Sequence, residues 1–351
     1  MFFASDNACP VHPKVMQALN AANSGYAPSY GNDEIMDRVR AQIRDIFEAP
    51  EAAVYLVATG TAANVLSLAC LAQPWSAIYS HQIAHIEMDE AGAPEFYTHG
   101  AKLKLVAGAD AKMTPATLRA ALGTTDHGTV HSIQNGALSI TNVTELGTVY
   151  SVAEITALAA IAKEAGMGVH LDGARFANAL VALGCSAAEM TWKAGVDVVS
   201  FGGTKNGLMG VEAVVIFDPK LAWEFELRRK RGAHLFSKHR YLSAQMEAYL
   251  SDGLWLELAR HSNGMAAVLA EAISALPGGS LAHPVQANMV FANWPASGHL
   301  AARAAGAQFY PWPHTESPEG KAPDTPVCAR LVTSWSTTMA DLDAFLELAA
   351  H

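Results

Sequence analysis

A lysine follows a short β-branched run near the middle of the 351-residue chain, where its amine could act as a nucleophile or bind an anion. Residues 196–201 predict a buried strand, and Gly202-Gly203-Thr204 then turn the chain into Lys205. Ligands of open α/β sheets bind beyond the strand ends, so this lysine would face a ligand. It could form a Schiff base with a carbonyl cofactor, or it could be an ordinary turn lysine. A phosphate-binding P-loop is disfavoured, because its Gly-Lys spacing is absent.

Two other predicted strands also end in groups that suit ligand binding. Residues 54–58 predict a strand, and Thr59-Gly60-Thr61 lead from it into an apolar helix over residues 65–71. This order aims free backbone N–H groups and threonine hydroxyls at an anion, although a plain helix cap is the alternative. Residues 168–171 predict another strand, which ends at Asp172. A carboxylate at a ligand crevice is costly unless a cation or an N–H group pairs with it.

Together these groups are the three contacts that pyridoxal phosphate needs. Its phosphate would lie at the helix start after Thr59-Gly60-Thr61. Asp172 would pair with the pyridine nitrogen and keep it protonated, so that the ring can act as an electron sink. Lys205 would form the imine. Three such groups at strand ends of one chain are a stronger indication than any one of them.

The elements that must position these groups alternate between strands and helices. Strands are expected at residues 54–58, 77–79, 103–106, 129–135, 168–171 and 196–201, with helices between them. This alternation predicts an α/β fold with a mostly parallel sheet and helices on both faces. Residues 244–276 are expected to be mostly helical, with a break near residues 262–264, and a small α+β unit follows.

Composition sets bounds on the partners and the location. The chain is 51% hydrophobic and 16% charged, which suits one large and one smaller domain. A net charge of −10 without a Lys/Arg block makes nucleic acid and anionic membranes unexpected partners. No apolar run is long enough to span a bilayer, and the first residues do not form a signal peptide. We expect reduced thiols in a cytoplasmic protein, and no metal site, because metal or redox spacing is lacking among Cys9, Cys70, Cys185 and Cys328.

With these residues in view, the sequence resembles the threonine aldolases, a group of the fold type I pyridoxal-phosphate enzymes. The resemblance runs from about residue 5 to residue 333. Three motifs are specific together: Thr59-Gly60-Thr61-Ala62-Ala63-Asn64, Ala84-His85-Ile86 with Glu90, and Val169-His170-Leu171-Asp172-Gly173-Ala174-Arg175. Weaker matches are Ser5-Asp6, Tyr30-Gly31, Thr204-Lys205 and Arg330-Leu331-Val332-Thr333.

The resemblance implies both a fold and a reaction. The fold would be of the aspartate-aminotransferase type, with a large cofactor-binding domain (residues 15–243) and a small domain (residues 1–14 and 244–351). The reaction would be the retro-aldol cleavage of β-hydroxy-α-amino acids, such as L-threonine, L-allo-threonine and phenylserine, to glycine and an aldehyde. Such an enzyme is a carbon-carbon lyase of amino-acid metabolism.

The same resemblance implies roles for single residues. Arg175 and Arg330 would hold the substrate carboxylate, because a guanidinium suits a carboxylate, and Ser5 and Tyr30 would add substrate contacts. His85 stacks on the cofactor ring in this family and is the first candidate for the base. The catalytic set is then Lys205, His85 and Asp172, and the cofactor would bind to Thr59, Gly60, Thr61, His85, Asp172, Arg175, Thr204 and Lys205.

The sequence departs from the family at the predicted fourth strand. Many members carry Glu-Asn-Thr-His there, and that histidine lies near the substrate hydroxyl. Residues 133–137 are Ile-Gln-Asn-Gly-Ala, so the histidine is missing, and His131 lies earlier on the predicted strand. The identity of the base and the side-chain preference therefore stay open.

Two rival interpretations also stay open. Another fold type I enzyme, either a β-eliminating lyase or an aminotransferase acting on a small amino acid, would use the same three contacts. A nucleotide-binding oxidoreductase is the rival from another class, but it needs G-x-G-x-x-G after the first strand, and residues 59–64 lack those glycines.

The resemblance also implies an assembly. Active sites of this family lie at a dimer interface, so a homodimer or homotetramer is expected. Tyr30 would then serve a partner's site. The basic run over residues 228–231 would either face a partner's phosphate or be a solvated helix face.

Overall fold

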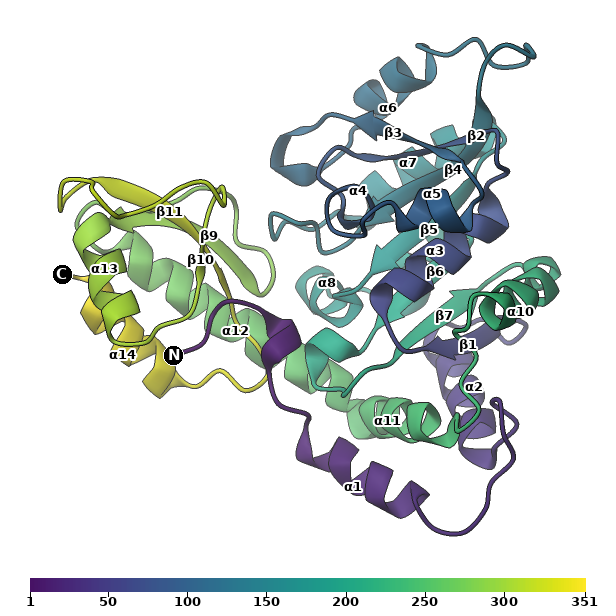
Figure 1. Ribbon diagram of the computed structural model, residues 1–351, viewed down its shortest axis with the longest axis horizontal. Helices are drawn as coiled ribbons and strands as arrows, with labels where there is room; N and C mark the ends of the chain where they lie inside the picture. Colours follow the sequence, from purple (N-terminus) through teal and green to yellow (C-terminus); the bar gives the residue numbers. More distant parts are fainter.

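The structure is a computed structural model that describes residues 1–351, and it consists of two lobes joined by a long helix (Figure 1). The larger lobe contains a seven-stranded sheet in the order β1-β7-β6-β5-β4-β2-β3, and the smaller lobe contains a four-stranded sheet in the order β10-β11-β9-β8. The strands are β1 (Ala53–Val57), β2 (Ser76–His81), β3 (Lys102–Val106), β4 (Gln134–Thr141), β5 (Gly168–Gly173), β6 (Val198–Gly202), β7 (Glu212–Ile216), β8 (Ser280–Leu281), β9 (Met289–Pro295), β10 (Tyr310–Pro311) and β11 (Pro326–Val332).

Helices cover the larger sheet and one face of the smaller one (Figure 1). They are α1 (Pro13–Ala22), α2 (Glu34–Ile46), α3 (Gly60–Leu71), α4 (His85–Met88), α5 (Ala93–Tyr97), α6 (Pro115–Leu122), α7 (Val152–Glu164), α8 (Phe176–Leu183), α9 (Ala187–Met190), α10 (Ala222–Arg231), α11 (Arg240–Leu250), α12 (Leu254–Ser274), α13 (Ala296–Ala304) and α14 (Met339–Ala349). Short 3₁₀ turns include η1 (Asp6–Ala8) and η4 (Thr204–Asn206). None of the helices combines the length and the apolar character that a bilayer span demands.

The larger sheet is parallel except for β7, which runs antiparallel to both β1 and β6. Its central strands are shielded on both faces, and Leu138, Val199 and Val215 are fully buried. Continuous apolar strands of this kind are typical of parallel sheets that lie between helices. The predicted α/β fold is confirmed, and the carboxyl ends of β1, β2, β4, β5 and β6 all meet at one edge.

The predicted fourth strand was placed too early in the sequence. Residues 129–133 form turns, and β4 begins at Gln134. The side-chain amide of Gln134 donates to the carbonyl oxygens of Thr129 (3.0 Å) and Ser132 (2.8 Å), which closes a loop in place of a strand. Val130 is almost completely exposed there, and His131 is exposed and lies outside the sheet. The β-branched residues were therefore a misleading strand signal.

The predicted helix break near residues 262–264 is also wrong, because α12 is continuous through it. Asn178 of α8 donates to both Ser262 and Asn263 (2.9 Å each), so these polar residues are satisfied without a break. The chain bends earlier, where Asp252 (φ 54°) and Gly253 (φ 70°) adopt left-handed conformations between α11 and α12.

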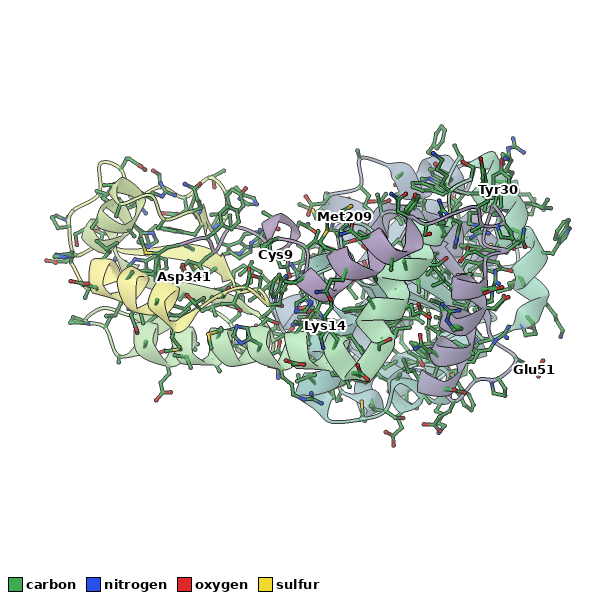
Figure 2. All side chains as sticks on the ribbon, turned by 90° about the horizontal axis from the view of Figure 1, so that it is seen from below. Cys9, Lys14, Tyr30, Glu51, Met209 and Asp341 are labelled. Atoms are coloured by element: carbon green, nitrogen blue, oxygen red, sulfur yellow. The ribbon has the colours of Figure 1, made fainter.

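The N-terminal segment joins the two lobes. Its first residues extend the smaller sheet. The N–H of Phe3 donates to the carbonyl of Gln308 (2.7 Å), and the carbonyl of Phe3 accepts the N–H of Val332 (2.8 Å). The chain then crosses to the larger lobe, and Cys9 lies at the junction between the lobes (Figure 2). The predicted boundary between residues 243 and 244 falls inside α11, which packs on α1 and α2, and the domain division as drawn stays a prediction.

Candidate active site

The candidate active site is a cavity of about 280 Å³ at the shared carboxyl edge of the parallel strands. Ligands of open α/β sheets bind at this edge. All eight residues predicted to bind the cofactor lie in its wall. The wall consists of Asn7, Ala58, Thr59, Gly60, Thr61, Asn64, His85, Thr141, Val143, Glu145, Asp172, Ala174, Arg175, Thr204, Lys205 and Glu212.

Two glycines at the end of β6 bring Lys205 into this cavity. A Cβ atom on Gly202 would lie 2.2 Å from the carbonyl oxygen of Ala174, and one on Gly203 would lie 2.4 Å from Leu208. Only glycine permits so close a packing, after which η4 presents Lys205. Burial, together with the charge of Arg175, lowers the pKa of Lys205, which favours the neutral and nucleophilic amine.

Asp172 is buried at the end of β5 and is held by two donors. The N–H of Ala174 donates to Oδ1 (3.0 Å), and the amide of Asn64 donates to Oδ2 (2.9 Å). Asn64 also donates to Oε1 of Glu90 (3.0 Å), and that oxygen lies 2.8 Å from Nδ1 of His85. The hydrogen bond to Glu90 raises the pKa of His85. The carboxylate and the imidazole are thus fixed in one network, with Nε2 as the free nitrogen of His85.

The start of α3 forms the anion-binding part of the wall. Oγ1 of Thr59 accepts the N–H of Ala62 (3.1 Å), so the predicted helix cap is present. The N–H groups of Gly60 and Thr61, in the first turn, have no acceptor within the helix. A Cβ atom on Gly60 would meet no atom within 4 Å, so the space beside this turn is open. Cap and anion site therefore coexist here.

Arg175 is oriented by a buried carboxylate from the N-terminal segment. Its Nε and Nη2 donate to Oδ2 (2.6 Å) and Oδ1 (2.8 Å) of Asp6, and Asn288 of the smaller lobe also donates to Asp6 (3.0 Å). Burial works against ionisation of Asp6, but Arg175 outweighs it and holds the pKa of Asp6 below its usual value. This contact connects both lobes to the cavity wall.

Three predicted substrate contacts lie outside the cavity wall. The guanidinium of Arg330 donates to the carbonyl of Ala4 (3.1 Å), and its Nε has no partner. The hydroxyl of Ser5 accepts the N–H of Asn7 (3.2 Å) and caps η1. Both residues border the N-terminal segment that carries Asp6, close to the cavity but not in its wall.

Tyr30 is the third predicted substrate contact outside the cavity wall, and it is distant from Arg330 and Ser5. It is 46% exposed, and the ammonium of Lys230 lies 5.2 Å from the centre of its ring. Figure 2 shows it at the far end of the larger lobe, away from the junction where Cys9 lies. A single chain does not bring Tyr30 to its own cavity.

Sequence reasoning missed several wall residues, and each was missed for a physical reason. Glu212 is a single carboxylate on the buried strand β7, where its Oε2 accepts the N–H of Gly203 (2.6 Å) and burial raises its pKa to about 7. Nothing in an apolar run marks such a residue. Asp6, which lies behind the wall, belongs to the matched Ser5-Asp6 motif, but its partner Arg175 is 169 positions away in the sequence.

Thr141, Val143 and Glu145 were missed because the fourth strand was misplaced. β4 ends at Thr141, and no histidine stands anywhere in residues 133–145.

Comparisons with known proteins identify the family of this chain. The sequence profile of the beta-eliminating lyases matches residues 3–295. Low specificity L-threonine aldolases of Pseudomonas aeruginosa and of a Pseudomonas species are each 42% identical, over 99% and 88% of this chain and 95% and 88% of their own. The threonine aldolase structure of Leishmania major superposes with a TM-score of 0.90 at 29% identity, over 99% of this chain and 98% of that one. The chain belongs to the beta-eliminating lyase family and, within it, to the threonine aldolases.

Proposed function

We propose that this chain cleaves L-threonine and related β-hydroxy-α-amino acids to glycine and an aldehyde, with pyridoxal phosphate as its cofactor. The observation that carries the proposal is the convergence of Lys205, Asp172 and the start of α3 on one cavity. The similarity to low specificity L-threonine aldolases over nearly the whole chain supports the same reaction.

The wall residues fit pyridoxal phosphate by their chemistry. The open start of α3, with Thr59, Gly60 and Thr61, suits the phosphate, and the buried carboxylate of Asp172 suits a protonated ring nitrogen. Lys205 supplies the amine, Thr204 adjoins it, and His85 contributes a flat ring at the cavity wall. When bound, the cofactor supplies a carbonyl that links to amines and a ring that stabilises negative charge on the substrate's Cα.

The chain's own residues would bind and orient the substrate. Arg175 is the guanidinium in the wall, and its bidentate contact with Asp6 fixes the plane in which it meets a carboxylate. We assign Arg330 a supporting role, with Ser5 as a further donor, because both border the segment that carries Asp6. Lys205, as a neutral amine, would accept and return protons at Cα.

We propose that two copies of the chain form the working unit. Tyr30 is exposed and remote from its own cavity, as expected of a residue that serves a partner's site. Exposed apolar side chains on α5 and α10, namely Phe96, Trp223 and Leu227, offer area for such an interface. A tetramer would be built from two such dimers, and four free cysteines support a cytoplasmic location.

The test measures products from L-threonine and L-allo-threonine with the cofactor-loaded protein. We expect glycine and acetaldehyde in equal amounts, and none from Lys205→Ala. Pyruvate with ammonia would indicate a β-eliminating lyase, and conversion of the cofactor to its amine form with a keto acid would indicate an aminotransferase. Either result would overturn the proposed reaction while leaving the cofactor site intact.

A further inference from the structure

Glu145 is a cavity residue to which the proposed function assigns no role. It follows β4 in a short turn, in which the N–H of Thr144 donates to the carbonyl of Thr148 (3.0 Å) and the two hydroxyls lie 2.8 Å apart. Thr144 and Thr148 are both buried. The turn is therefore fixed, and it holds the Glu145 side chain against the cavity.

One carboxyl oxygen of Glu145 is engaged and the other is not. Oε1 accepts the backbone N–H of His85 (2.6 Å). Oε2 is shut off from solvent and has no hydrogen-bond partner. A buried oxygen of this kind is costly unless a group fills the site and donates to it.

The other carboxylates of the wall lack this feature. Both oxygens of Asp172 accept hydrogen bonds, and Oε2 of Glu212 accepts the N–H of Gly203. His85 has Nδ1 bound to Glu90. Glu145 is thus the carboxylate in the wall with an unpaired buried oxygen, and it lies just beyond the end of β4.

The surroundings of Glu145 suit proton transfer near neutral pH. Burial, and then the charge of Asp172 on β5, raise its pKa to about 7, against the opposing effect of His85 on α4. Lys205 and Glu212 line the same cavity. Tyr150 is a further titratable group near Glu145, and burial raises the pKa of Tyr150 far above neutrality, so it stays protonated. A general base works best when its pKa lies near the working pH.

We infer that Glu145 accepts the proton of the substrate's β-hydroxyl through Oε2. The inference rests on the proposed function. It adds the base, whose identity the missing family histidine left open. The proton moves from the β-oxygen to Oε2, and the β-oxygen forms its double bond to Cβ. The Cα–Cβ bond breaks with its electron pair left on Cα, and the aldehyde leaves. Protonation of Cα then gives glycine, and Glu145 gives up its proton before the next cycle, which restores the carboxylate.

The test compares Glu145→Gln with the wild type and with Glu271→Gln, an exposed control on α12. Glutamine keeps an oxygen that accepts the N–H of His85 but cannot take a proton. We expect kcat for threonine cleavage to fall by about 10²- to 10⁴-fold, with KM changed less than threefold, and the rise of kcat with pH near 7 to disappear. The control should match the wild type.

Glycine as a substrate distinguishes a role of Glu145 as the base for the hydroxyl from a general structural role. Exchange of the Cα proton of glycine in D₂O, followed by NMR, needs the cofactor and Lys205 but no base for a hydroxyl. Glu145→Gln should exchange glycine at a rate within threefold of the wild type. Loss of both reactions would assign Glu145 to cofactor or fold maintenance and overturn the inference, as would cleavage within twofold of the wild type.

The cofactor-free protein gives a readout that does not depend on activity. Because the folded pKa of Glu145 lies above its unfolded value, the wild type loses stability relative to Glu145→Gln as pH rises from about 4.5 to about 7. The Tm of the wild type should therefore fall relative to the Tm of Glu145→Gln between pH 5 and pH 8. A difference that is constant across this range would contradict the assignment. A wild type inactive on threonine, with this shift intact, would instead refute the proposed function.

Discussion

Arg175 already donates from Nε and Nη2 to Asp6, so the plane of its guanidinium is set before a substrate carboxylate arrives. Asp6 in turn accepts from Asn288, so one carboxylate is shared by the N-terminal segment, the larger lobe and the smaller lobe. A side chain oriented in this way loses less entropy on binding than a free arginine does.

The residue-scale prediction concerns Asp6→Asn. The amide leaves Arg175 without its counter-charge, and we expect KM for threonine to rise at least tenfold and stability to fall by about 3 kcal/mol at pH 7. Because Arg175 holds the pKa of Asp6 below its usual value, the pair stabilises the wild type above about pH 4 and is lost as pH falls below it.

Denaturant unfolding between pH 2 and pH 7 provides the measurement. The stability gap between the wild type and Asp6→Asn should close towards low pH. Asp343→Asn, an exposed aspartate on α14, is the control and should show no gap. A gap of equal size at all pH values would show that the ion pair is not its source.

Two glycines at element boundaries, one at the end of a strand and one at the start of a helix, have opposite surroundings. Gly202 ends β6 where a Cβ atom would lie 2.2 Å from the backbone of Ala174, whereas Gly60 begins α3 beside open space. The first glycine permits packing of the fold, and the second leaves room for a ligand.

The element-scale prediction uses these two glycines as matched alanine substitutions. Gly202→Ala should destabilise the cofactor-free protein by about 1–3 kcal/mol, because backbone must move. Gly60→Ala should leave its Tm unchanged but weaken cofactor binding at least tenfold, because the methyl group enters the phosphate space. Thermal unfolding and a spectroscopic cofactor titration measure the two effects. Equal cofactor affinity in Gly60→Ala and the wild type would remove α3 from the phosphate site.

Elements near the strongest motifs were predictable from the sequence, and others were not. The strands before Thr59, Asp172 and Lys205 were found because apolar runs end there at turn residues. β4 was misplaced because residues 129–133 carry strand-forming types but are held as a loop by the side chain of Gln134. The break in α12 was expected at polar residues whose partners on α8 are far away in sequence. Local patterns cannot register such tertiary contacts.

The whole molecule places its active site where contacts distant in sequence meet. The cavity lies on the larger lobe, but Asn7 in its wall and Asp6 behind it come from the segment that also extends the smaller sheet. The predicted site residues of the strand ends converge, while Tyr30 is exposed and does not lie in the cavity wall.

Complementation between two inactive variants tests whether Tyr30 serves the active site of a partner subunit. Lys205→Ala and Tyr30→Ala should each be nearly inactive as separate proteins. When unfolded together and refolded as a mixture, they should regain up to a quarter of wild-type activity, because the mixed dimer has one site with both residues intact. A mixture no more active than the sum of its parts would show that Tyr30 serves no partner site.

The central claim is that Lys205 carries the cofactor, and the most direct measurement is reduction of the cofactor-loaded protein with borohydride, followed by peptide mass spectrometry. We predict the mass of the reduced cofactor on the peptide that contains Lys205 and on no other lysine, and its absence from Lys205→Ala. An adduct on a different lysine, or a wild-type protein that takes up no cofactor, would contradict the account.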